Sequence, residues 1–209
     1  MEELRHIQMT YGIPVQSHLS ESKGKNEFVK FLRPDDPFWG DGYNEYDLFG
    51  KNDDIDTDFK TDMAHCVWST GEEVELMRKK GVFVAHCPAS NMNLTSGIAP
   101  IRKYMDLGLN IGLGSDIAGG RSDSIFRAIA DAIQVSKMYF QMVDESVSRN
   151  RAILPLRAAV HFSVRLAAWS QATSLTLLYW MIACCHMRRH LILLNEWNGR
   201  YIWDWKERK

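Results

Sequence analysis

Four short apolar stretches recur along the first part of the chain, separated by longer polar or amphipathic segments. They cover residues 13–20, 62–68, 81–87 and 109–116. Each is too short for a typical helix and is bounded by turn-forming or polar residues. The pattern therefore predicts four strands.

The segments between these stretches carry helical signals. The sequence STGEEVELMRKKG has acidic residues in a first turn and basic residues in a last turn. It predicts a helix that begins after Ser69 or Thr70 and ends before Gly81. Residues 122–143 repeat isoleucine every fourth position, which is typical of an amphipathic helix.

Strands that alternate with helices predict βα units and a parallel sheet. In parallel barrels, the side chains that carry out chemistry lie at the carboxyl ends of the strands. The polar residues predicted to lie at such ends are His18, His65, His86 and Asp116.

Each of these residues alone has an ordinary explanation. A single histidine after a strand is more often structural than a ligand, His86 could equally anchor a loop, and Asp116 could cap a helix. As a set, imidazoles and a carboxylate on successive strand ends are the ligands that Zn²⁺ takes. Bound zinc lowers the pKa of a water to about 7. Glu21, just beyond His18, could then move the proton to a leaving group.

Four ordered blocks in this chain resemble a known family. The blocks HLSES, MAHCVW, VAHCPASNMNLTSGIAPI and GLGSDIAGG are similar to those of the metal-dependent amidohydrolases, and within them to the guanine deaminases. The resemblance covers roughly residues 5–145, and its guanine-specific part depends mainly on SDIAGG at 115–120. It implies an α/β fold that forms part of a (β/α)8 TIM barrel, about the fifth to the eighth βα units.

The same resemblance implies a role for each site residue. His18 and Asp116 would be the metal ligands, and the cofactor would be one Zn²⁺. Glu21, His65 and Asp116 would be catalytic, as proton shuttle, holder of the attacking water or the substrate oxygen, and base. His18, Glu21 and Asp116 would also contact the substrate. The implied reaction converts guanine to xanthine and ammonia. We expect His86 to be structural.

One family feature is absent from this sequence. The family's first strand bears His-x-His, which supplies two zinc ligands, and no such motif occurs in the chain. The resemblance implies that the strand bearing it would precede Met1. With His18 and Asp116 as the expected ligands, we expect weak zinc binding and little activity from this chain alone.

The last part of the chain differs from the first 150 residues. Residues 1–150 are predominantly acidic, whereas 151–209 are basic and contain five of the seven tryptophans. We interpret 1–150 as the carboxyl-terminal half of an amidohydrolase barrel and 151–209 as an aberrant tail outside the family. The tail reads as a frameshifted translation, because codons for residues 174–182 can encode, in another frame, a peptide similar to the family's closing strand.

Composition limits the remaining alternatives. A net charge of −1 gives no reason to expect a nucleic-acid partner. The four cysteines lack metal-binding or disulfide-framework spacing, and the amino terminus lacks an export signal, so we expect a cytoplasmic protein without a membrane partner. The resemblance implies that full-length relatives are homo-oligomers.

Two other functions stay open. The chain could be another amidohydrolase that acts on an amino- or halogen-substituted heterocycle. Alternatively it could be a non-catalytic protein bound to a partner or to a membrane, with the uncharged residues 166–185 as its anchor.

Overall fold

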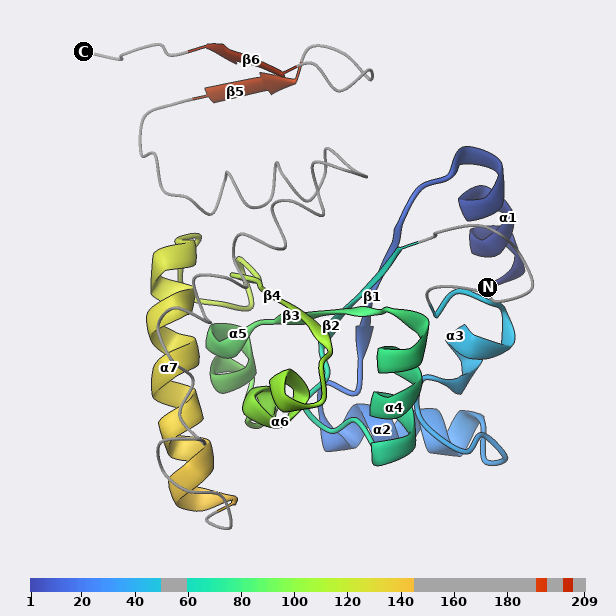
Figure 1. Cartoon of the computed structure of the whole chain (residues 1–209), viewed down its shortest axis with the longest axis horizontal. Coiled ribbons are helices and arrows are strands. Elements are labelled where there is room, and N and C mark those ends of the chain that lie inside the picture. The colour runs from blue at the N-terminus through green and yellow to red at the C-terminus, as the bar shows by residue number, and fades with distance from the viewer. Residues whose placement is uncertain (50–59, 145–190, 195–200, 205–209) are drawn as a thin grey trace.

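The computed structural model describes residues 1–49, 60–144, 191–194 and 201–204 (Figure 1). A four-stranded parallel sheet organises the first two ranges, and its strand order is β1-β2-β3-β4. Its strands are β1 Val15–Leu19, β2 Thr61–His65, β3 Phe83–His86 and β4 Asn110–Leu113. The expected strands and their parallel arrangement are confirmed, although each strand is shorter than its apolar stretch.

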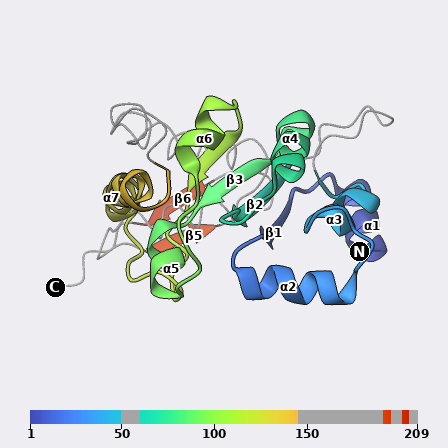
Figure 2. The same cartoon turned by 90° about the horizontal axis from the view of Figure 1, so that it is seen from below.

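Helices precede, connect and follow these strands. α1 Glu2–Tyr11 comes before β1, and α7 Ile125–Met142 comes after β4. The helices between successive strands are α2 Lys23–Leu32, α3 Asp41–Glu45, α4 Gly71–Lys80, α5 Pro88–Asn93 and α6 Ile101–Asp106. The two helices expected from the sequence are α4 and α7. Figure 2 shows β1, β2 and β3 side by side in chain order, with α4 and α6 on one side.

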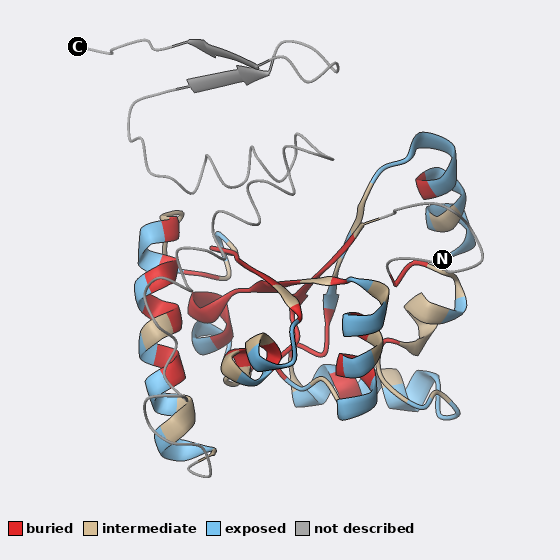
Figure 3. Cartoon of the chain, viewed as in Figure 1, coloured by how far each residue is buried: buried red, intermediate tan, exposed pale blue. Residues whose placement is uncertain are grey.

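One face of the sheet packs against helices and forms the main core. Met63, Val84 and Ile111 lie side by side on this face and are fully buried. Apolar residues of α4, α6 and α7 belong to the same cluster. Figure 3 shows the buried residues concentrated along the strands and on the sides of these helices that face them. Burial of this surface is the main force that holds the βα units together.

The opposite face of the sheet is more polar. Gln16 and His18 are exposed on β1, and the register places Asp62 and Ala64 beside them on β2. Asp62 is completely buried, and its Oδ2 accepts a hydrogen bond of 3.0 Å from Gln16 Nε2. Its Oδ1 has no hydrogen-bond partner among the described residues. Burial raises the pKa of Asp62 to about 7, although the Gln16 hydrogen bond opposes this shift.

A local signal explains where α4 begins and ends. Thr70 is its N-cap, and the Thr70 hydroxyl oxygen accepts a hydrogen bond of 3.2 Å from the backbone N–H of Glu73. Gly81 ends the helix with a left-handed φ of 69°, which glycine adopts without steric cost. Of the two caps that the sequence allowed, the structure therefore uses Thr70.

We expect Thr70→Ala to lower the free energy of unfolding by about 1 kcal/mol, because one N–H in the first turn of α4 loses its acceptor. Thr70→Ser keeps a hydroxyl at the cap and is expected to retain most of the stability. Chemical denaturation of the three proteins measures the difference. Equal losses for alanine and serine would show that the hydroxyl cap contributes nothing.

The described part of the tail consists of two strands. β5 Leu191–Leu194 and β6 Tyr201–Asp204 pair antiparallel, with Leu191 opposite Asp204. The boundary at residue 150, the uncharged run 166–185 and the segment 174–182 all lie outside the described residues. In the part of the chain that is described, no helix combines the length and the apolar character needed to span a bilayer.

Candidate active site

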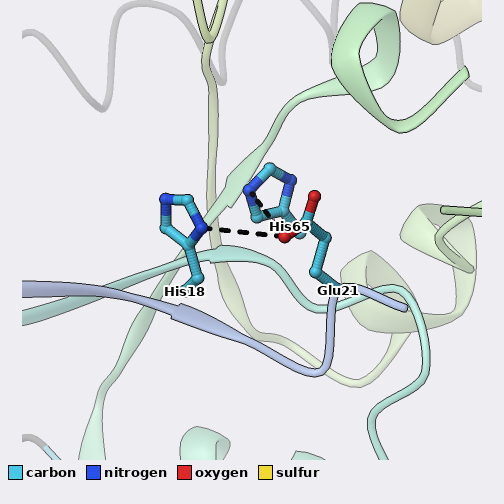
Figure 4. Close-up of side chains that lie close together, drawn as sticks. All are labelled: His18, Glu21 and His65. Carbon is cyan, nitrogen blue, oxygen red and sulfur yellow. Dashed lines mark ion pairs between the residues drawn. The ribbon is translucent and has the colours of Figure 1, made fainter. Parts of the chain in front are cut away.

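Three of the residues selected from the sequence meet at the carboxyl ends of β1 and β2 (Figure 4). His18 lies near the end of β1, Glu21 follows two residues after that strand, and His65 is the last residue of β2. Glu21 Oε2 lies 3.7 Å from His18 Nδ1 and 4.0 Å from His65 Nε2. The two imidazole rings contact each other edge to face, with centroids 4.6 Å apart.

An unusual backbone conformation accompanies the end of β2. His65 has a φ of 73° and Cys66 a φ of 46°, both in the left-handed region that residues with a Cβ rarely adopt. Two hydrogen bonds hold this turn: Cys66 N–H donates to the carbonyl of Leu19 at 3.0 Å, and the Tyr104 hydroxyl donates to the carbonyl of Cys66 at 2.8 Å. The backbone departs from the strand where His65 must reach Glu21, as is common for residues held at functional sites.

A buried carboxylate supports the turn that carries Glu21. Glu73 of α4 is fully buried, and its two oxygens accept hydrogen bonds from the Ser20 hydroxyl at 2.9 Å and from the Gly40 N–H at 2.7 Å. Burial raises the pKa of Glu73, and the hydrogen bonds that it accepts oppose this shift. Ser20 is thereby fixed directly before Glu21, although its own φ of 46° is left-handed.

The Glu21 carboxylate is buried and held on both of its oxygens. Ser96 Oγ donates to Glu21 Oε1 at 3.3 Å, and Lys25 Nζ forms an ion pair with Glu21 Oε2. Burial alone would raise the pKa of Glu21, but the hydrogen bond and the charge of Lys25 contribute to holding it below its usual value. Glu21 is therefore ionised at neutral pH and can accept a proton.

His65 is buried and is held by an amide. Its Nδ1 lies 2.8 Å from the side-chain oxygen of Asn91. Burial lowers the pKa of His65, and this outweighs the opposite effect of the Asn91 hydrogen bond and of the nearby carboxylates. The imidazole is therefore neutral at pH 7. Its Nε2 is buried, with no hydrogen-bond partner in the described part of the chain.

Asp116 lies outside this tight cluster. It follows β4 by three residues, is partly exposed and has a φ of 47°. It is close enough to His65 for its charge to raise the pKa of that imidazole. It does not cap the next helix, because the N-cap of α7 is Ser124, so the reading of Asp116 as a cap of that helix is wrong.

The glycines after Asp116 are required by their surroundings. A Cβ at Gly119 would lie 2.7 Å from Asp116 Oδ2, and one at Gly120 would lie 2.2 Å from the carbonyl oxygen of Ser115. A Cβ at position 119 would therefore move the Asp116 carboxylate, and one at position 120 would displace the loop backbone. This explains the GG pair that ends the SDIAGG block.

His86 is a neutral, buried residue at the end of β3. Burial, and after it the charge of His65, lower the pKa of His86 to about 3. It is absent from the cluster of possible metal ligands among the described residues. These observations agree with the structural role expected from the sequence, but they do not test it.

His18, Glu21 and His65 have the donor types of a metal site. One ligand atom from each lies within 4.8 Å of the others, and two imidazole nitrogens with a carboxylate oxygen suit a divalent ion such as zinc. This set differs from the pair expected from the sequence, because it contains Glu21 and His65 and lacks Asp116. The Lys25 ammonium beside Glu21 competes with an ion for that carboxylate.

Comparison with known proteins agrees with this fold. A family model described as "Amidohydrolase family" matches residues 1–156. Guanine deaminase of Rattus norvegicus is 38% identical over 139 residues, which are 66% of this chain and 29% of the rat protein. A 5'-deoxyadenosine deaminase of Methanocaldococcus jannaschii is 30% identical over 167 residues, 79% of this chain and 36% of that protein.

The fold is also found in a solved structure of a similar protein. Guanine deaminase from C. acetobutylicum, with guanine bound in its active site, superposes with a TM-score of 0.70 at 40% sequence identity. The alignment covers 78% of this chain and 36% of the other.

A parallel α/β sheet with polar side chains at its carboxyl ends agrees with the family that the comparison gives. The family match extends over most of the sequence, so the protein belongs to the amidohydrolase family. The chain spans about a third or less of the length of the three relatives described above.

Proposed function

We propose that this chain carries part of the active site of an enzyme that deaminates guanine to xanthine and ammonia. The observation that carries the proposal is the meeting of Glu21 and His65 beside His18, within a region 40% identical to a guanine deaminase with bound guanine. Both the cluster and the similarity fall in the part of the chain that matches the amidohydrolase family.

The proposed fold places β1 to β4 as about the fifth to the eighth βα units of a (β/α)8 barrel. This agrees with their parallel order and with the position of the cluster at the carboxyl ends of the strands. The proposed substrate is a small purine. A cytoplasmic location and a homo-oligomeric full-length protein complete the proposal.

The proposed cofactor is zinc, held by His18 and Asp116. Both side chains are at least partly exposed at the carboxyl ends of their strands, β1 for His18 and β4 for Asp116, which leaves them accessible to an ion. When bound, zinc supplies a Lewis acid and lowers the pKa of an adjacent water.

The protein side chains perform the proton transfers. His65 holds the attacking water at the ring carbon that bears the amino group. Glu21, ionised at the start, contacts the purine, takes one proton from that water and delivers it to the departing nitrogen. Asp116, as base, takes the second proton of the water from the new hydroxyl group and passes it to the neighbouring ring nitrogen. The new C–O bond replaces the C–N bond, and ammonia leaves. Contacts from His18, Glu21 and Asp116 orient the substrate.

A second candidate substrate has a specific observation in its favour. The 5'-deoxyadenosine deaminase described above matches a larger share of this chain than the rat guanine deaminase does, although at lower identity. Ammonia release from guanine, 5'-deoxyadenosine and an amino-triazine, measured side by side, separates these substrate classes. Activity on 5'-deoxyadenosine alone would replace guanine as the proposed substrate.

The metal part of the proposal predicts that His18→Ala removes zinc binding. We expect the unaltered chain to take up zinc weakly, and the variant to lose at least tenfold in affinity, because one of two expected ligands is gone. Calorimetric titration with zinc measures both. His6→Ala, which changes an exposed histidine of α1, is the matched control. If His18→Ala and His6→Ala bind zinc equally, His18 is not a ligand.

A further inference from the structure

Asn91 is the buried side chain that contacts His65 at Nδ1, the ring nitrogen other than the one nearest Glu21. It belongs to the short helix α5, is only 2% exposed, and comes from a segment 26 residues away from His65 in the sequence. Its backbone is held on both sides: its N–H donates to the carbonyl of Cys87 at 3.1 Å, and its carbonyl accepts from the N–H of Ser96 at 2.9 Å. The position of the amide group is therefore fixed by the helix and by the turn that follows it.

The contact determines which nitrogen of His65 carries the proton. The amide oxygen of Asn91 faces His65 Nδ1 at 2.8 Å, and an amide oxygen can only accept a hydrogen bond. In a neutral imidazole one nitrogen is a donor and the other an acceptor. Nδ1 is then the donor, so Nε2 keeps its lone pair.

That lone pair faces the reacting groups. His65 Nε2 is 4.0 Å from Glu21 Oε2, and Nε2 has no hydrogen-bond partner in the described ranges. A water at about 2.8 Å from both atoms would span them at an angle of roughly 90°, close to the angle between the two O–H bonds of water. Both of its hydrogens would then point at the protein, and its oxygen lone pairs would remain free.

We propose that Asn91 is a positioning residue that holds His65 in the tautomer with hydrogen on Nδ1, so that Nε2 accepts a hydrogen bond from water beside Glu21. The catalytic part of this inference rests on the proposed function, whereas the tautomer does not. Of the two partners expected for His65, the attacking water and the substrate oxygen, this tautomer selects the water. A nitrogen without hydrogen can accept from water but cannot donate to a carbonyl oxygen of the substrate.

The energetics of Asn91 separate this role from a purely structural one. The amide nitrogen of Asn91 is buried, with no hydrogen-bond partner among the residues described, and such a donor is costly. Replacement by leucine removes one hydrogen bond to His65 and also removes this unpartnered donor. The free energy of unfolding is therefore expected to change little, while the His65 tautomer changes.

The test is nitrogen NMR of the full 209-residue chain labelled with 15N-histidine, at alkaline pH. The signals of His65 are assigned by their loss in His65→Gln. We expect hydrogen on Nδ1 in the unaltered chain and in Asn91→Asp, whose carboxylate is also an acceptor. In Asn91→Leu we expect the hydrogen to move to Nε2. Asn93→Leu is the matched control, because Asn93 lies on α5 but donates to the Gly119 carbonyl instead.

Hydrogen on Nε2 in the unaltered chain would overturn the proposal, and so would an unchanged tautomer in Asn91→Leu. In a form of the protein that deaminates its substrate, Asn91→Leu is expected to lower kcat about 10- to 100-fold with little change in KM. If the tautomer changes as expected but no form releases ammonia, the proposed function fails and the assignment of Asn91 remains.

Discussion

Glu21→Gln is expected to lower the rate of guanine deamination by about 10² to 10⁴, the usual contribution of a general acid–base group. Glutamine keeps the shape of the side chain and can still accept from Ser96, but it cannot take up and release a proton. The ion pair with Lys25 is lost at the same time. Steady-state ammonia release in a form of the protein that deaminates guanine measures the effect.

Glu27→Gln provides the matched control, because Glu27 is an exposed glutamate on α2, the helix that follows Glu21. It should leave the rate unchanged. Thermal unfolding of both variants checks that a loss of activity is not a loss of fold. A rate for Glu21→Gln within about tenfold of the unaltered protein would remove Glu21 from the role of proton shuttle.

The second large effect concerns stability and comes from Asp62. Burial raises its pKa to about 7, from a usual value of 3.8, so the folded protein holds this proton to higher pH than the unfolded chain does. The stabilising contribution is fully present below pH 3.8 and is lost as pH rises to about 7. The total change is about 4 kcal/mol, at 1.36 kcal/mol for each pH unit of difference.

Asp62→Asn removes this pH dependence and keeps an acceptor for Gln16. We expect the stability of the variant relative to the unaltered protein to increase by roughly 3 kcal/mol between about pH 5 and about pH 8. Urea denaturation at both pH values gives the two differences. Asp35→Asn, on an exposed aspartate, should show no such trend. A difference for Asp62→Asn that does not change with pH would mean that Asp62 is ionised in the fold at both.

The parallel sheet could be predicted from the sequence because short strand-like stretches alternate with helical ones, and each neighbouring strand follows in chain order. The helices α4 and α7 were also predictable, from a cap and a stop in one and from periodic isoleucines in the other. The short helices α5 and α6 were not, because six residues hold less than two turns and show no reliable period.

The grouping of His18, Glu21 and His65 followed from the topology, because the carboxyl ends of neighbouring parallel strands lie at the same end of the sheet. Their orientation did not follow. The left-handed backbone at His65 has no glycine or asparagine to signal it, and it depends on hydrogen bonds from distant residues. Regular strand alternation alone would place His65 on the face of Met63, away from His18.

The residues that hold the site were not found from sequence. The ion pair between Lys25 and Glu21 could have been predicted. Lys25 follows Glu21 by four positions at the start of a helix, and oppositely charged side chains at this spacing lie close together. Ser96 and Asn91 belong to the VAHCPASNMNLTSGIAPI block, which the sequence linked to the family but not to the support of Glu21 or His65. Their contacts join residues 75 and 26 positions apart, which no local pattern specifies.

The Glu73 carboxylate has a consequence for the order in which the protein folds. Its hydrogen bonds join it to Ser20 across 53 residues and to Gly40 across 33. Closing such long loops costs entropy before any contact compensates for it, so these contacts form late. We therefore expect the turn bearing Glu21 to become ordered only after β1, β2 and α4 have assembled. On this pathway, ordering of the Glu21 turn would lag behind the gain of helical signal during refolding.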